Sequence, residues 1–152
     1  MTIERIFTRP SLGGPQIERQ TVCVVAGSGI EGDRYFDRHD EPGQNITFIE
    51  AEAIESFLEA QGLPSDLSIS GRNVVTRGVR LNDLVGQEFT VGGLLFLGVE
   101  LCEPCLGLGE KLATSTLPVA KVVKGLVHKA GLRADALSSG ALTLGDPFRS
   151  AA

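Results

Sequence analysis

Two apolar runs joined by a pair of glycines constrain the fold of this chain more than any other feature of its sequence. The runs Glu88–Val91 and Leu94–Leu101 are rich in aromatic, aliphatic and β-branched residues, and only Gly92 and Gly93 separate them. A Gly-Gly pair in this position predicts a β-hairpin, because the central residues of a tight hairpin turn need a positive φ. Since apolar side chains occur on both faces of the hairpin, we expect the longer strand to be enclosed on each side.

Other short runs in the chain also have the composition of strands. They are Thr21–Val25, followed by a turn over 26–29, and Asn45–Ile49, Ala134–Leu137 and Ala141–Leu144. Because only Ser138, Ser139 and Gly140 separate the last two runs, we expect them to form a second hairpin. The sequence Gly145-Asp146-Pro147 is predicted to end the final strand.

Two segments have the periodicity of helices. The first, Glu50–Gln61, places Ile54, Phe57 and Leu58 on one face, and the second runs from Pro118 to Lys129 with valines and leucines at helical spacing. Two helices among many short strands do not make a βαβ series. We therefore predict a mainly β fold, a closed β-barrel with a few flanking α-helices, built as a single domain over residues 1–152.

Composition excludes several classes of function. The chain of 152 residues is 42% hydrophobic, which suffices for one globular core, and its net charge of −5 argues against a nucleic-acid-binding surface. We see no secretory signal, and no apolar run approaches the ~18 residues of a membrane-spanning helix. Three cysteines, an odd number, favour a reducing compartment. The expectation is a soluble cytoplasmic protein without nucleic-acid or membrane partners.

The tetrad Cys102-Glu103-Pro104-Cys105 carries the strongest chemical signal. It follows a predicted strand, so its second thiol is expected at the rim of a sheet, where a ligand can reach it. Thiolate chemistry also needs a nearby positive charge, which Arg72 could supply. The alternative is that Cys105 packs as a small buried hydrophobe, as free cysteines often do.

Cys102 and Cys105 could form half a zinc site, but the remaining candidate ligands, Cys23, His39 and His128, have no paired spacing. Cys102 and Cys23 are therefore predicted to be core residues, and the alternative role of Cys102 is to resolve an oxidised or persulfidated Cys105.

A series of short motifs, in order along the chain, resembles the MOSC domain family, named after the C-terminal domain of molybdenum-cofactor sulfurase. The series begins with Gly29-Ile30-Glu31-Gly32-Asp33-Arg34, Gln44-Asn45-Ile46-Thr47-Phe48-Ile49 and Gly71-Arg72-Asn73-Val74-Val75. It continues with the glycines and leucines of 78–86, Glu103-Pro104-Cys105, Gly131-Leu132-Arg133-Ala134, and the strand from Gly140 to Asp146. Each motif alone is weak, and their joint order and spacing carry the resemblance.

The resemblance implies a MOSC-type β-barrel and a role for Cys105. In this family the matching cysteine is thought to ligate molybdenum or to carry sulfur as a persulfide, and some members reduce N-hydroxylated compounds. The chain lacks the pyridoxal-phosphate domain of the sulfurases, so sulfur would come from a separate donor protein. Electrons would likewise come from an electron-transfer partner. A soft thiolate suits both molybdenum ligation and persulfide storage.

Five arginines gather in the middle of this acidic chain: Arg34, Arg38, Arg72, Arg77 and Arg80. The molybdenum cofactor is a pterin with a phosphate, and arginine is well suited to bind phosphate. We expect Arg34, Arg72 and Asn73 to bind the cofactor, because they fall on the family motifs, with Asp33 orienting Arg34. The other three arginines are interpreted as surface charges paired with Asp33, Asp37, Asp40 and Glu41.

Three functions therefore stay open at the level of sequence. The first is a molybdenum-cofactor protein with Cys105 as metal ligand, which reduces N-hydroxylated compounds. The second is a sulfur carrier that holds a persulfide on Cys105 for a metal-sulfur or cofactor centre. The third is a non-catalytic module that binds a small anion.

Overall fold

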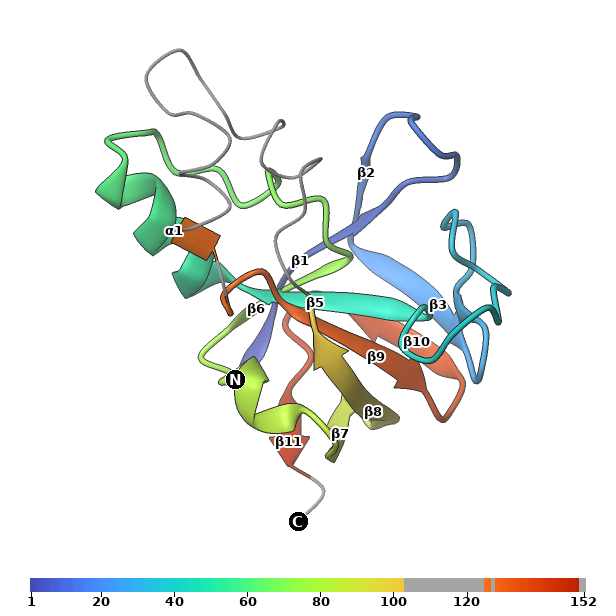
Figure 1. The fold of residues 1–152 in the computed structure, drawn as a ribbon. Coiled ribbons are helices and arrows are strands. Elements are labelled where there is room, and N and C mark those ends of the chain that lie inside the picture. The colour runs from blue at the N-terminus through green and yellow to red at the C-terminus, as the bar shows by residue number, and fades with distance from the viewer. Residues whose placement is uncertain (103–124, 127, 151–152) are drawn as a thin grey trace.

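The computed structural model describes residues 1–102, 125–126 and 128–150. Its elements, in chain order, are β1 (Thr2–Thr8), β2 (Ile17–Arg19), β3 (Thr21–Val25), β4 (Gly29–Ile30), β5 (Ile46–Glu50), α1 (Ala51–Ala60), β6 (Val74–Arg77), the short 3₁₀ helix η1 (Leu81–Leu84), β7 (Glu88–Val91), β8 (Leu94–Leu101), β9 (Leu132–Ala136), β10 (Gly140–Thr143) and β11 (Phe148–Ser150). The described part of the chain is therefore mainly β, as predicted (Figure 1).

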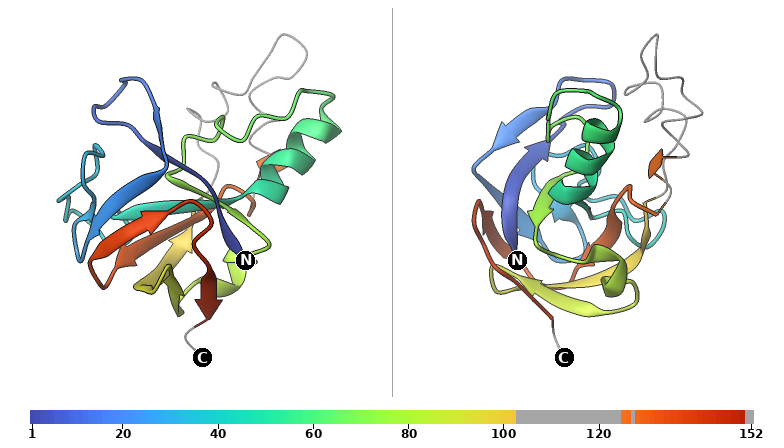
Figure 2. Two further views of the ribbon diagram at one scale, coloured as in Figure 1. Left: turned by 180° about the vertical axis from the view of Figure 1, so that it is seen from behind. Right: turned by 90° about the vertical axis from the view of Figure 1, so that its left-hand side faces the viewer.

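The strands form two sheets. The larger has the order β11-β7-β8-β9-β5-β6-β1-β2, and the smaller has the order β10-β3-β4. The larger sheet curls strongly, so that β7 and β11 lie below the strands that carry α1 (Figure 2). Of the strand pairs in the described residues, β5 and β6 run parallel and the others run antiparallel.

The predicted closure of the barrel is wrong. The edge strands of the larger sheet, β2 and β11, do not pair with each other in the described residues. The start of β1 meets the β10–β11 connection at an isolated bridge between Thr2 and Pro147, which is flanked by backbone hydrogen bonds such as Ile3 N–H to the carbonyl of Asp146 at 3.0 Å. This contact lies mainly in the connection 145–147, which is not itself a strand. Just before it, β10 has paired with β3 in the smaller sheet. The larger sheet is thus a curled half-barrel.

The hairpin predicted around Gly92 and Gly93 is confirmed. It pairs β7 with β8 from Val91 opposite Leu94, and the two glycines have φ of 57° and 82°, which L-residues with side chains rarely adopt. The expected enclosure of β8 on both faces is wrong, because Phe96 and Gly98 are buried whereas Leu95, Leu97 and Val99 are partly exposed. A register shift between Gly98 and Glu100 then turns Leu101 toward the core.

The second predicted hairpin is also wrong, although both of its strands exist. β9 lies between β8 and β5 in the larger sheet, whereas β10 pairs with β3 in the smaller one. The connecting serines explain the split, because they attach to different strands. Ser138 Oγ accepts the Leu95 N–H at 2.8 Å, and Ser139 Oγ accepts the Ala26 N–H at 2.9 Å. After β10 the chain forms one more strand, β11, which the sequence analysis missed.

The first predicted helix is confirmed as α1, with Ile54, Phe57 and Leu58 buried. It connects β5 to β6, which run side by side and parallel, so the chain contains one βαβ unit that its sequence pattern did not reveal. Parallel strands require such a crossover connection. Most of the second predicted helix lies outside the described residues. Within its range, residues 125 and 126 are helical and His128 is exposed.

Two clusters of apolar side chains form the core. The first fills the inside of the curled sheet, where the ring of Phe48 lies edge-on to those of Phe89, Phe96 and Phe148 at centroid distances of 5.6–5.7 Å. Such contacts add to the gain from burial. The second cluster packs α1 against the outer face of β5 and β6. Strand β5 therefore contributes to both clusters.

The cysteines at 23 and 102 occupy different environments. Cys102 is buried in the second cluster, as predicted. Cys23 is exposed, which corrects the prediction of a core residue, because its neighbours Val22 and Val24 occupy the inward-facing positions of β3. Neither α1 nor any other helical segment among the described residues has the length and apolarity needed to traverse a membrane.

Glu50, at the junction of β5 and α1, gives a pH-dependent prediction. Burial raises the pKa of its carboxyl group above the ordinary value, and Oε2 accepts the Leu81 N–H at 3.1 Å. A raised pKa in the folded state means that the ionised carboxylate destabilises the fold at pH above that pKa, and this penalty disappears as the carboxylate is protonated. Glu50→Gln keeps an acceptor for Leu81, so we expect a slightly higher melting temperature at pH 7.

The gain should shrink as the pH falls and vanish below the ordinary pKa of a glutamate. Thermal unfolding of both proteins between pH 3.5 and pH 8 measures it. A stabilisation that is the same at all pH values would contradict the assignment to burial of charge.

Candidate functional site

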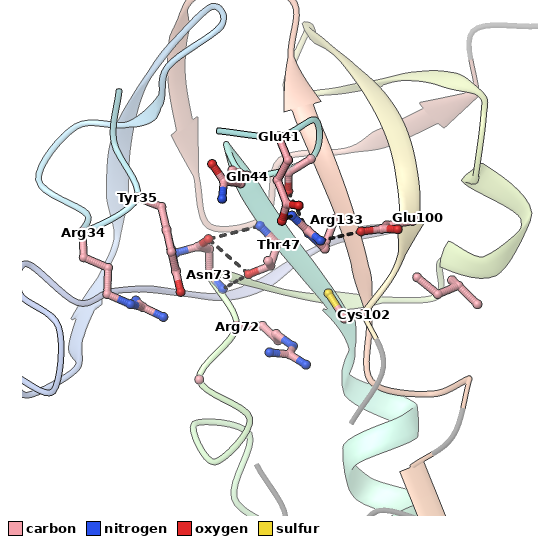
Figure 3. A pocket seen from close by; sticks show the side chains of 13 residues that line it. Arg34, Tyr35, Glu41, Gln44, Thr47, Arg72, Asn73, Glu100, Cys102 and Arg133 are labelled. Carbon is pink, nitrogen blue, oxygen red and sulfur yellow. Dashed lines mark hydrogen bonds and ion pairs between the residues drawn. The ribbon is translucent and has the colours of Figure 1, made fainter. Parts of the chain in front are cut away.

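A pocket of about 480 Å³ opens where the ends of four strands of the larger sheet meet a long loop. Its walls come from β5, the residues before β6, the end of β8, the start of β9 and the loop 34–44. The lining residues are Arg34, Tyr35, Glu41, Gly43, Gln44, Thr47, Gly71, Arg72, Asn73, Glu100, Leu101, Cys102 and Arg133 (Figure 3). The pocket therefore brings together Arg34, Arg72 and Asn73, three of the residues predicted to bind a ligand.

Asn73 and Thr47 form the polar floor of the pocket. Asn73 Oδ1 accepts hydrogen bonds from Thr47 N and Thr47 Oγ1, both at 3.1 Å, and Thr47 Oγ1 accepts the Asn73 N–H at 3.0 Å. Asn73 Nδ2 also donates to the carbonyl of Phe7 at 3.2 Å. Asn73 is buried and joins β1, β5 and β6, so its main contacts are with the protein itself.

The guanidinium group of Arg72 uses one nitrogen for a hydrogen bond within the protein, and its other two nitrogens can donate to a ligand. Its Nε donates to the carbonyl of Ala130 at 2.9 Å, and within the described part of the chain its two Nη groups have no acceptor. A guanidinium group anchored in this way has a restricted orientation and still presents donors suited to an oxyanion.

Arg34 extends into the same pocket from the loop that follows β4 (Figure 3). Its guanidinium carbon lies over the ring of Tyr35, 4.5 Å from the centroid, and Nη1 is 3.7 Å from Asp33 Oδ1. Asp33 is buried, and its carboxylate accepts the N–H groups of Arg9 at 2.9 Å and Tyr35 at 3.3 Å. Asp33 therefore fixes the loop that carries Arg34, in line with the predicted orienting role, but it does not line the pocket.

Arg133 is a third arginine of the pocket that the sequence analysis did not select. Its Nη2 donates to Glu41 Oε1 at 2.7 Å, Nη1 donates to Glu100 Oε1, and Nε donates to the carbonyl of Gly43 at 3.2 Å. A side chain at Gly43 would be strained and tightly packed, since its φ is 81° and a Cβ there would lie 3.2 Å from Arg133 Cβ. The only sequence signal was its place in the motif Gly131-Leu132-Arg133-Ala134.

Cys102 lines the pocket at the end of β8 and donates its backbone N–H to the carbonyl of Gly131 at 2.7 Å. Cys105, the predicted metal ligand, lies outside the described residues, as do Glu103 and Pro104. Among the residues that are described, no group of three or more His, Cys, Asp or Glu side chains is arranged to hold a metal ion.

Comparison with known proteins identifies the family. The family model described as MOSC domain matches residues 36–149 of the 152-residue chain. The chain belongs to the MOSC domain family. This family is associated with binding of the molybdenum cofactor.

Solved structures agree with the fold of this MOSC protein. The YuaD protein from Bacillus subtilis is similar with a TM-score of 0.82 at 20% identity, over 97% of this chain and 94% of that one. YiiM from Escherichia coli is similar with a TM-score of 0.67 at 17% identity, over 100% of this chain and 70% of that one. YiiM from Geobacillus stearothermophilus gives a TM-score of 0.67 at 18% identity, over 99% of this chain and 73% of that one. Among curated proteins, no sequence matches.

The remaining arginines of this MOSC protein do not line the pocket. Arg77 pairs with Glu4 and Glu55, and its hydrogen bond lowers the pKa of the Glu55 carboxyl group. Arg80 pairs with Asp83, and Arg38 is exposed. Arg77 and Arg80 are thus surface charges, as interpreted from the sequence, although their acidic partners are not the predicted ones.

The contacts of Asn73 predict a large loss of stability in Asn73→Ala. The substitution leaves the Thr47 N–H and the Phe7 carbonyl without their side-chain partners, so we expect a loss of about 2–4 kcal/mol in the free energy of unfolding. Thr47→Val removes only the hydroxyl and should cost less. Urea denaturation of both single variants and the double variant measures the coupling between the two side chains. Additive effects would show that the pair does not act as a unit.

Proposed function

We propose that this MOSC protein binds the molybdenum cofactor in the pocket, with Cys105 as a ligand of the metal. The observation that carries the proposal is the pair of half-buried guanidinium groups, Arg34 and Arg72, directed into one pocket with donors that the described protein does not use. In the described residues, the anion that lies next to them is Asp33, 3.7 Å from Arg34, so two cations that line one partly desolvated pocket favour the binding of a further anion.

The residues of the pocket fit the chemistry of such a group. Arg34 and Arg72 would bind the phosphate, because planar guanidinium groups match phosphate oxygens in pairs. The volume of about 480 Å³ lies within the range of small-molecule and cofactor sites. The floor of Asn73 and Thr47 is neutral and rigid, so it can support a flat ring without competing for the anion.

Cys105 is within reach of this pocket along the chain. Cys102 lines the pocket, and three residues of fully extended chain span at most about 11 Å. A thiol in the neighbourhood of Arg34 and Arg72 is favoured as the thiolate, the form that ligates a metal. In this proposal the donor set comprises one soft ligand, Cys105, and one anion site formed by Arg34 and Arg72.

When bound, the cofactor would supply a redox-active metal. The overall reaction that we propose is reduction of an N-hydroxylated compound, which takes up two electrons and two protons and releases water. The electrons would come from an electron-transfer partner protein. The role of the protein in this reaction is to bind and orient the cofactor through Arg34, Arg72 and Cys105.

The test is the molybdenum and pterin content of protein purified from a host that makes the cofactor. We expect close to one molybdenum and one pterin per chain in the wild type, and loss of the metal in Cys105→Ala. Cys23→Ala is the matched control, because it removes an exposed thiol of the smaller sheet and should keep full content. Arg72→Gln should weaken retention of the pterin by about tenfold or more, since it loses a charge-assisted contact.

For the arginine variant, Arg38→Gln is the control, because Arg38 is exposed and lies outside the pocket. Absence of both metal and pterin from the wild type would refute the proposal. In that case a mass gain of one sulfur atom on Cys105 would identify a persulfide carrier. No modification, with phosphate binding intact, would identify an anion-binding module.

A further inference from the structure

The pocket is polarised, with unused hydrogen-bond donors at one end and unused acceptors at the other. Figure 3 shows Arg34 at the left and Arg72 below Thr47 and Asn73, whereas Glu41, Glu100 and Arg133 lie above and to the right of this floor. One set of residues presents positively charged hydrogen-bond donors, and the other presents carboxylate oxygens as acceptors.

At the donor end, Arg34 has one long ion pair with the buried Asp33, and in the described part of the chain the Nη groups of both arginines remain available to a ligand. The Nη groups of Arg72 have no acceptor in the described residues, and the Arg34–Asp33 separation of 3.7 Å is longer than a hydrogen bond. This end is therefore complementary to an anion.

At the acceptor end, the positive charge of Arg133 is more than balanced. One oxygen of Glu41 and one of Glu100 accept from its guanidinium group, and each carboxylate has a second oxygen without a donor in the part of the chain that the structure describes. Gln44 lines the same pocket, and its Oε1 is buried without a hydrogen-bond donor. Arg133 holds both carboxylates at the pocket wall, where the side chains of Glu41 and Glu100 remain 56% and 55% exposed. This end is complementary to N–H groups.

The floor adds few hydrogen-bonding groups to either end, because Asn73 and Thr47 use their polar atoms largely for each other and for Phe7. A ligand is therefore recognised mainly at its two ends. An anion placed at the wrong end would face two carboxylates, and this penalty sets a single binding orientation.

We propose that the pocket selects ligands with an anionic group at one end and an amino or ring N–H group at the other, with Glu100 and Glu41 accepting from those N–H groups. This proposal rests on the proposed function in one respect, the choice of a pterin as the ring that carries both an anionic substituent and N–H groups. Its aminopyrimidine edge would lie toward Glu100 and Glu41, and its anionic substituent toward Arg34 and Arg72.

Two probes separate the ends of the pocket: inorganic phosphate, which has only the anion, and pterin-6-carboxylate, which has both features. Their affinities are measured on full-length protein from cells that cannot make the cofactor, by competition and by pterin fluorescence. In Glu100→Gln, loss of a negative charge should leave phosphate binding unchanged or tighten it by up to about threefold. The same change should weaken pterin-6-carboxylate about tenfold, because an ionic acceptor is lost.

The different responses of the two affinities are decisive, because a general electrostatic effect would strengthen the binding of both anionic probes. Glu41→Gln should give the same split, and Glu88→Gln, the same charge change at an exposed site on β7, should give none. Arg72→Gln should weaken both probes. The proposal is overturned if Glu100→Gln and Glu41→Gln shift both probes in the same direction or neither, or if the wild type does not bind the pterin.

The molybdenum content of the wild type from a cofactor-producing host decides the proposed function separately. If the protein binds the cofactor but the glutamate variants change both probe affinities alike, only the proposed polarity of the pocket is refuted. Split affinities in a protein that never acquires metal would refute only the proposed function.

Discussion

The hydrogen bonds between Asn73 and Thr47 hold together the part of the sheet on which the pocket depends. They lie where β6 runs parallel to β5 and antiparallel to β1. Because parallel neighbours need a crossover, the chain must leave β5 through α1 and return before β6. The returning segment contains Arg72, directly before Asn73, and the carbonyl of Ala130 holds the Nε atom of its side chain. The position of Arg72, and with it that of the proposed anion site, thus follows from the pairing of two strands.

The three arginines of the pocket differ in how much of their charge is available. Arg133 has carboxylates on both sides and a carbonyl at Nε, so it acts as a structural tie between the loop 41–43, β8 and β9. Arg72 is held only at Nε, and Arg34 has one long contact with a buried carboxylate. The chain has a net charge of −5, so attraction of an anion cannot come from its overall field and must come from these local donors.

Local features of the fold could be predicted from the sequence, whereas features that depend on distant residues could not. The β7–β8 hairpin, β3, β5 and α1 are set by neighbouring residues, such as the glycine pair at 92 and 93. The separation of β9 from β10 depends on Ser138 and Ser139 bonding to strands far away in sequence. The open edge of the half-barrel depends likewise on β10 pairing with β3, which lies far away in sequence. Arg34, Arg72 and Arg133 all lie on motifs of the sequence. The role of Arg133 becomes evident only beside Glu41 and Glu100, which are 92 and 33 residues away.

The way the site is built separates stability from ligand preference. Asn73 and Thr47 are buried or half-buried and bond to the protein, so changing them disturbs the sheet. Glu41, Arg34 and Gln44 belong to the loop between β4 and β5, and Glu100 is at the exposed end of β8. These residues can change with little effect on the core, which lies on the inner face of the sheet and under α1. This arrangement would allow the walls of the pocket to change without loss of the sheet that holds Arg72 beside Asn73.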